Sequence, residues 1–188
     1  MVCLRRWSPF VHLKYLEANH PQGSLLFAGS TAVKSLAAYI NDFGGTALRP
    51  HYAALFLPKI PALLDDESRD YFINEKVGTA RFEKIKFALS DKSACDGHVA
   101  QLKSLLAPFG TMLSTKPAIK SASQDGKRWL AGTEHPTHAD ICLFGWYVFS
   151  RSDSKIGDEI WTSNPALAQW VKDMREWCGE DFIKDLVG

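Results

Sequence analysis

The residues with the clearest capacity for chemistry are His135, His138 and Asp140, which lie close together just before a long apolar run. Two imidazoles and a carboxylate are side chains that bind Zn²⁺ or act as a general acid and base. Either function requires the three side chains to converge on one point. Thr137 stands three residues before Asp140, however, and this spacing allows a second interpretation as the start of a helix.

The spacing favours a helix cap. In a helix that begins after Thr137, His138 and Asp140 point to different sides, so they are poor joint ligands. In a capping box the Thr137 hydroxyl accepts from the third helical N–H, and the Asp140 carboxylate accepts from the N–H of Thr137. Pro136 and Ile141 occupy the positions of a hydrophobic staple. We predict that Thr137 and Asp140 are structural, that no metal is bound, and that Asp140→Ala costs about 1–2 kcal/mol of stability.

The helix that follows this cap contains the segment ICLFGWYVF at 141–149. A helix that is apolar on all sides is typical of the buried centre of a domain, and we expect that position here. Gly145 lowers helix propensity by about 1 kcal/mol. A glycine at this point therefore predicts that another helix approaches closely.

A 3.6-residue period recurs along most of the chain, and strand signals are nearly absent. The fold class that this predicts is all-α, a helical bundle. We expect helices at 30–44 (ended by Gly44-Gly45), 47–58, 64–90 (broken near Gly78), 95–114 (kinked or divided at Pro108) and from Asn164-Pro165 to Gly179, with a loop at 115–133.

The composition and net charge limit the classes of partner that we expect for this chain. The chain has 188 residues, 46% of them hydrophobic, which indicates a packed core within the size range of one domain. The net charge of +1 predicts neither nucleic-acid binding nor attachment to an anionic membrane, and no run is long enough to span a bilayer. Four widely spaced cysteines favour reduced thiols in a cytoplasmic protein. Phosphate-loop, dinucleotide-binding, zinc-protease and serine-hydrolase motifs are missing from the sequence.

The segment KRWLAGTEHPTHADICLFGWYV at 127–148 resembles the C-terminal domain of the glutathione S-transferase superfamily, in which a Ser/Thr and an Asp cap the central helix. The resemblance implies an all-α domain at 28–188 with glutathione as co-substrate and a small hydrophobic electrophile as substrate. It also implies electrophile contacts at Tyr71, Phe72, Glu75 and Trp146. A homodimer is one of the partner states that we consider for this chain. The matching residues are Trp129, Leu130, Gly132, Pro136, Thr137, Ala139, Asp140 and Ile141.

The segment FVHLKYLEANHPQGSLLFAGS at 10–30 is similar to the end of the family's thioredoxin-like domain, so we expect residues 1–27 to be a remnant of that domain and its linker. Ser8 and Pro9 stand where the family has its glutathione-binding acid and serine, and proline offers neither an N–H nor a hydroxyl. We therefore expect a truncated chain that lacks transferase activity alone, and no catalytic residue is assigned.

Segments 68–76 and 127–149 look most like the fungal and bacterial branches that include etherase-type and ustiloxin-cluster-type transferases. Three interpretations stay open. The full-length form transfers glutathione to an electrophile or cleaves one with it; the chain is a non-catalytic interaction module, as transferase-like domains are in translation factors and tRNA synthetases; or the fragment is unstable by itself.

Overall fold

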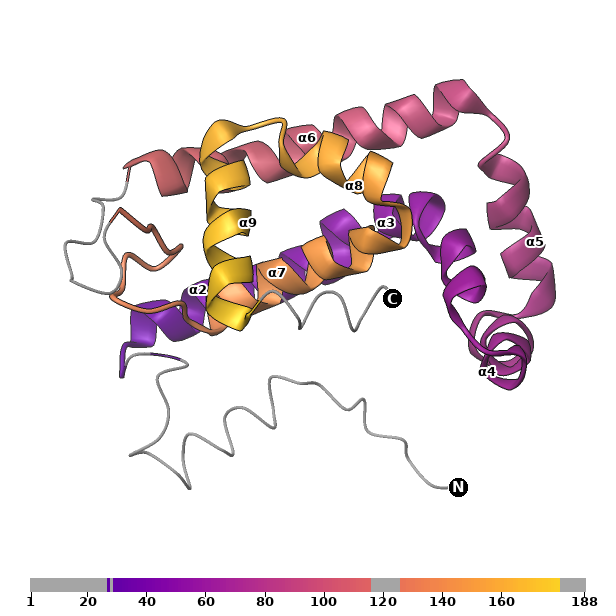
Figure 1. Ribbon diagram of the computed structural model, residues 1–188, viewed down its shortest axis with the longest axis horizontal. Coiled ribbons are helices and arrows are strands. Elements are labelled where there is room, and N and C mark those ends of the chain that lie inside the picture. The colour runs from indigo at the N-terminus through magenta and orange to yellow at the C-terminus, as the bar shows by residue number, and fades with distance from the viewer. Residues whose placement is uncertain (1–26, 28, 116–125, 180–188) are drawn as a thin grey trace.

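The computed structural model describes Phe27 and residues 29–115 and 126–179. The expected remnant at 1–27 lies outside this part except for Phe27, as does most of the expected loop at 115–133. Within the described part the chain is helical and has no strand, which confirms the all-α prediction (Figure 1). The elements are α2 (Thr31–Phe43), η1 (Gly44–Leu48), α3 (Arg49–Leu55), η2 (Leu57–Leu63), α4 (Asp66–Tyr71), η3 (Phe72–Val77), α5 (Thr79–Ala88), α6 (Lys92–Thr115), α7 (His138–Ser150), η4 (Arg151–Asp153), α8 (Ser154–Trp161) and α9 (Pro165–Cys178).

The bundle has two sides with the core between them. On one side α2 packs along α7, and on the other α6 contacts α8 and α9 (Figure 1). The segment from η2 to α5 leaves this bundle at one end and returns at the start of α6. In the described ranges, no helix combines the length and the apolar composition needed to cross a bilayer. The largest fully buried side chains are Trp129, Trp161, Trp170, Tyr52, Phe27 and Phe56.

The α-helix α2 ends at Phe43, beside Gly44-Gly45 as predicted, but the chain stays helical there instead of turning away. The chain passes from α2 through η1, a wider turn of π type, directly into α3. A Cβ atom on Gly44 would clash with the indole of Trp146, so glycine is the residue that lets this helix pass α7. The close approach predicted at Gly145 is wrong, because Gly145 is exposed and a Cβ there would meet no atom within 4 Å.

Pro108 does not divide the long helix. The helix α6 runs unbroken from Lys92 to Thr115 although proline costs about 3 kcal/mol in a helix interior. Pro108 is exposed, whereas Leu106 and Phe109 on either side of it are buried, and this packing offsets the lost hydrogen bond. The break near Gly78 is confirmed, since that residue separates η3 from α5 with φ of 88°.

The last helix follows the predicted boundaries. Asn164 caps α9 by accepting from the N–H groups of Ala166 (3.0 Å) and Leu167 (3.2 Å). The helix ends before Gly179, whose φ is 85°. A Cβ atom on Gly110 of α6 would clash with the Asn164 side chain, so the cap also marks a close contact between α6 and α9.

The carboxylate of Asp140 is fully buried and joins three parts of the chain. Its Oδ2 accepts from the N–H of Thr137 (2.8 Å) and from the Thr137 hydroxyl (3.0 Å), and the two residues form a capping box at the start of α7. Its Oδ1 accepts from the Leu130 N–H (2.9 Å) and from the indole N–H of Trp170 (3.0 Å). Asp140 therefore holds the loop before α7, the start of α7 and α9 together.

Burial raises the pKa of the Asp140 carboxyl, and the donors from Leu130, Thr137 and Trp170 act in the opposite direction because they favour the ionised form. All four partners are donors, and only a carboxylate accepts from all of them at once. An amide or a methyl group in this place leaves buried N–H groups without a partner, which costs about 1–3 kcal/mol for each group.

We expect Asp140→Ala to lower the free energy of unfolding by about 3–5 kcal/mol, more than a cap alone, because a buried charged acceptor with three partner residues is removed. Asp91→Ala is the matched control: Asp91 caps α6 by accepting from the Ala94 N–H, and its loss costs about 1 kcal/mol. Urea denaturation of both variants checks this. Equal losses would show that the contacts to Leu130 and Trp170 contribute nothing.

A pair of histidines links α3 to α6. The Nδ1 atoms of His51 and His98 lie 2.9 Å apart, and the rings meet edge to face. A hydrogen bond between the two Nδ1 atoms requires that one of them carries a proton and the other does not. Protonation of both Nδ1 atoms would break this bond. Burial lowers the pKa of His51 below 6.5, and repulsion from His98 lowers it further.

Because the pKa of His51 is lower in the folded state, the unfolded chain binds more protons, and stability falls as the pH drops below about 6.5. His138, whose pKa burial also lowers, acts in the same direction. We expect His98→Gln to reduce the loss of stability between pH 7.5 and 5.5, measured as the change in Tm. His135→Gln, which affects no histidine pair, should keep the full loss. A variant of His98 with unchanged pH dependence would contradict this prediction.

Candidate functional site

A pocket of about 520 Å³ lies where the segment from η2 to α5 meets the bundle, within the size range of small-molecule sites. Its lining is largely apolar and comes from α3, η2, η3, α5 and α7, so it forms only when these elements assemble. The lining residues are Arg49, Ala53, Leu57, Phe72, Lys76, Val77, Arg81, Cys142, Gly145, Trp146 and Phe149.

One face of α7 forms the floor of this pocket. Cys142, Gly145, Trp146 and Phe149 recur at helical spacing and therefore share a face. The opposite face, represented by Phe144 and Tyr147, is buried in the core. The α7 helix is central and much of it is buried, as expected, but its continuous apolar sequence serves a core on one side and a pocket on the other.

Aromatic contacts hold Trp146 in place. Its ring lies edge to face with Tyr52, at 4.9 Å between centroids, and with Phe149 at 6.3 Å. Gly44 lies against the indole and leaves no space between the two helices. A floor fixed from several sides presents the same surface before and after a ligand binds, which limits the entropy lost on binding.

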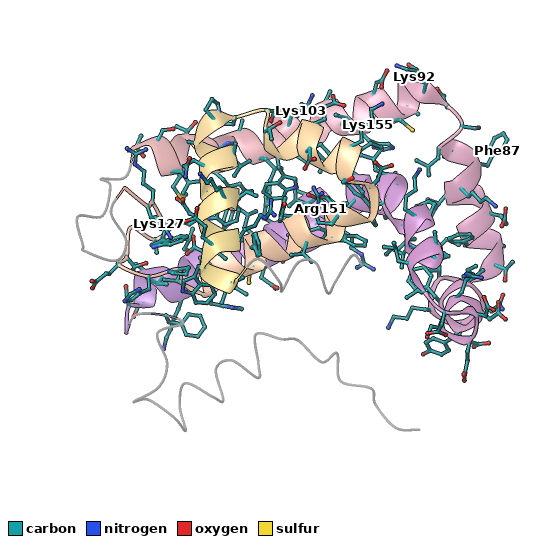
Figure 2. The ribbon with its side chains drawn as sticks, viewed as in Figure 1. Phe87, Lys92, Lys103, Lys127, Arg151 and Lys155 are labelled. Atoms are coloured by element: carbon teal, nitrogen blue, oxygen red, sulfur yellow. The ribbon has the colours of Figure 1, made fainter. Side chains whose placement is uncertain are left out.

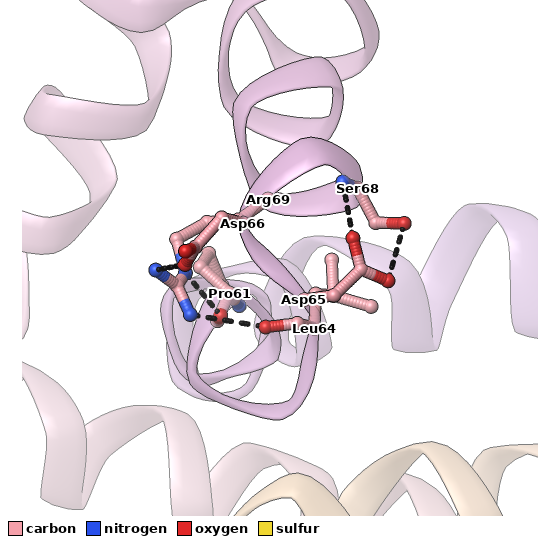
Figure 3. A network of polar contacts seen from close by, with 6 residues as sticks. All are labelled: Pro61, Leu64, Asp65, Asp66, Ser68 and Arg69. Carbon is pink, nitrogen blue, oxygen red and sulfur yellow. Dashed lines mark hydrogen bonds and ion pairs between the residues drawn. The ribbon is translucent and has the colours of Figure 1, made fainter.

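The opposite wall depends on how α4 begins (Figure 3). The guanidinium of Arg69 donates to the carbonyls of Pro61 (2.9 Å) and Leu64 (3.0 Å) and to the carboxylate of Asp66 (2.7 Å). Asp65 caps the same helix. These bonds tie α4 to η2, and α4 continues without interruption into η3, the element that brings its residues to the pocket.

The structure brings together two of the four substrate contacts expected from sequence. Phe72 and Trp146 both line the pocket. Tyr71 is 61% exposed and lines a neighbouring hollow over α4 and η3. Glu75 is exposed and lines neither of these hollows. Thr137 and Asp140 lie in the helix cap described above.

Sequence reasoning missed the cationic residues Arg49, Lys76 and Arg81. Lys76 follows Phe72 by four positions, so shared placement on one helix face was a usable signal. No comparable sequence signal identified Arg49 or Arg81, because they come from separate elements that meet only in the folded chain.

Cys142 and His138 form a pair beside the pocket, with 3.3 Å between Sγ and Nε2. Burial raises the pKa of the Cys142 thiol to about 11 and lowers that of His138. Both groups are thus neutral near pH 7, and the pair does not supply the thiolate that a cysteine nucleophile needs. Nor do the described histidines, cysteines, aspartates and glutamates form a group of three or more with a metal-binding arrangement. The arrangement supports binding rather than nucleophilic catalysis by this thiol.

Comparison with protein families gives one result. Residues 35–177 match a family model described as "Glutathione S-transferase, C-terminal domain". The matched range contains every residue that lines the pocket. Searches of curated proteins and of solved structures returned no match.

We expect Gly44→Ala to lower the free energy of unfolding by about 1–3 kcal/mol, because the added methyl displaces the Trp146 indole from its packed position. Gly45→Ala is the matched control, since a Cβ there meets nothing within 4 Å and alanine favours the helix by up to about 1 kcal/mol. Chemical denaturation measures both. If the two variants are equally stable, Trp146 is not confined by Gly44.

Proposed function

The chain belongs to the glutathione S-transferase family through its C-terminal domain, and we propose that this domain supplies the electrophile pocket of a glutathione-dependent transferase. The observation that carries the proposal is the apolar pocket floored by α7, with Trp146 and Phe149 on one side and Phe72 on the other. Aromatic side chains of this kind hold a small hydrophobic electrophile by burial and ring contacts. Glutathione is the proposed co-substrate.

In the proposed reaction, the sulfur of the glutathione thiolate attacks an electrophilic carbon held over Trp146. A C–S bond forms, and the electron pair of the broken bond leaves with the displaced group or is protonated after addition. The pocket orients the carbon and excludes water from it. Activation of the thiol is assigned to the thioredoxin-like domain that the family resemblance implies, because the Cys142–His138 pair is neutral. The 188-residue chain alone is therefore expected to have low activity.

The finer assignment is to the branches of etherase-type and ustiloxin-cluster-type transferases. Two segments support it, 68–76 and 127–149, and both contribute residues to the pocket lining. The first contains Phe72 and Lys76 of the pocket, and the second contains the pocket face of α7. A cytoplasmic location is also proposed, and it is supported by the free thiols of Cys95, Cys142 and Cys178.

A second candidate function is a non-catalytic interaction module that binds a partner protein or a second copy of the chain. Phe87 supports it, because this phenylalanine is 81% exposed near the end of α5 and projects away from the bundle (Figure 2). Large apolar side chains that stay exposed together mark interaction surfaces, and Phe87 is one such side chain. The pocket is the stronger basis for a function.

Gly145→Leu tests the pocket without disturbing the fold. Gly145 lies in α7 facing open space, so leucine fills the pocket and also favours the helix by roughly 0.6–0.8 kcal/mol. Gly97→Leu makes the same change on α6, where a Cβ also meets nothing within 4 Å. With the neutral probe 1-naphthaleneacetamide, we expect Gly97→Leu to bind as the unmodified chain does and Gly145→Leu to bind at least about tenfold more weakly, a difference of about 1.4 kcal/mol.

Isothermal titration calorimetry measures the affinities, and thermal melting checks that both variants are folded. Equal binding by all three proteins would place the probe outside the pocket and contradict the proposal. Absence of binding by the unmodified chain, together with co-purification of a stoichiometric protein partner, would favour the interaction module.

A further inference from the structure

We propose that the natural ligand of the pocket is a small amphipathic anion, an aromatic or aliphatic carboxylate whose charged end meets Arg49, Lys76 and Arg81. Its apolar body lies on Trp146 and Phe149. The inference rests on the proposed function, because it names the class of electrophile that the same pocket accepts.

Charge is distributed unevenly around the pocket. Three cationic side chains contribute to the lining, from α3, η3 and α5, and no aspartate or glutamate does. The formal charge of the lining at neutral pH is therefore positive, although the whole chain carries only +1. The sign of this local charge selects an anion.

Some cations elsewhere in the described ranges have acidic partners, and others have none. Lys59 lies 3.4 Å from Asp153, and Arg151 lies 2.5 Å from Asp158. Arg69 uses its donors on two carbonyls and a carboxylate (Figure 3). In the described ranges, by contrast, Arg49, Lys76 and Arg81 form no ion pair and no hydrogen bond, so their donors remain available to a ligand.

Exposure sets the orientation of the ligand. Arg49, Lys76 and Arg81 are exposed, whereas Trp146 and Phe149 are half-buried on the floor. An amphipathic anion matches both features when its carboxylate stays near the entrance and its apolar part lies deeper. Guanidinium groups bind carboxylates through paired N–H donors, and the apolar walls strengthen this attraction relative to bulk water.

The same geometry indicates that the carboxylate bound by these cations belongs to the electrophile and not to glutathione. A γ-glutamyl peptide is polar along most of its length, and it offers little apolar surface to Trp146, Phe149 and Phe72. An electrophile with an aromatic or aliphatic body buries these rings and places its reactive carbon in the apolar part of the pocket. The cations then bind the end of the molecule that does not react.

The test compares two probes that differ in charge and little in shape, 1-naphthaleneacetate and 1-naphthaleneacetamide. With the unmodified chain at low ionic strength, we expect the carboxylate to bind about tenfold more tightly than the amide. The preference should shrink at about 0.5 M salt, where screening shortens the range of exposed charges. The combined variant Arg49→Gln, Lys76→Gln and Arg81→Gln should bind both probes equally and keep the affinity for the amide.

A charge-matched control removes three cations from the α6 and α8 side of the bundle, namely Lys92→Gln, Lys103→Gln and Lys155→Gln (Figure 2). This control should keep the preference for the carboxylate, because it changes the net charge by the same amount without touching the pocket. If it loses the preference as the pocket variant does, the effect belongs to the overall field of the protein and the inference is overturned.

The remaining outcomes separate the inference from the proposed function. If the unmodified chain binds both probes equally and Gly145→Leu abolishes the binding of both, the proposed function is supported and the inference of an anionic ligand is overturned. If neither probe binds, both proposals fail. If glutathione displaces the carboxylate competitively and the triple pocket variant removes this competition, the cations hold glutathione and the inference is overturned.

Discussion

The buried carboxylate of Asp140 is the interaction on which the rest of the domain depends. It accepts hydrogen bonds from Leu130 in the preceding loop, from Thr137 at the start of α7 and from Trp170 in α9. An ionised group in the core is costly unless donors replace the lost water, and here four of them do so. The same arrangement fixes where α7 begins, and thereby where every residue along that helix points.

The orientation of α7 matters because both of its faces are used. One face packs in the core, while Cys142, Gly145, Trp146 and Phe149 on the other face the pocket. A rotation of the helix would place Trp146 differently and would expose part of the core. Glycines at the contacts limit such movement, since a side chain at Gly44 would meet Trp146 and one at Gly157 would meet Ser150. The helix cap therefore fixes the geometry of the pocket floor.

The pocket separates binding from activation. In the proposed function, the aromatic floor and the cationic side chains of the pocket bind a ligand, whereas burial keeps the Cys142 thiol neutral. A neutral thiol beside an electrophile is less prone to be modified by it, because the thiolate is the reactive form. This property is consistent with the proposed function, in which glutathione supplies the nucleophile.

Local patterns in the sequence were sufficient to predict the helical class, the cap formed by Thr137 and Asp140, the break at Gly78 and the limits of the last helix. Each of these depends on a few neighbouring residues and on backbone hydrogen bonds that such residues satisfy or interrupt. The family resemblance, rather than a local pattern, implied Phe72 and Trp146 as electrophile contacts, and both residues line the pocket.

Only the tertiary structure decided the rest. Gly44 and Gly145 look alike in sequence, yet one lies against an indole and the other faces open space. Pro108 stays inside α6 because packing on both sides compensates for it, and Arg49, Lys76 and Arg81 meet around one pocket although they lie on three elements. Such outcomes depend on which distant segments pack together, and the free energy of that packing is a property of the assembled fold rather than of any one segment.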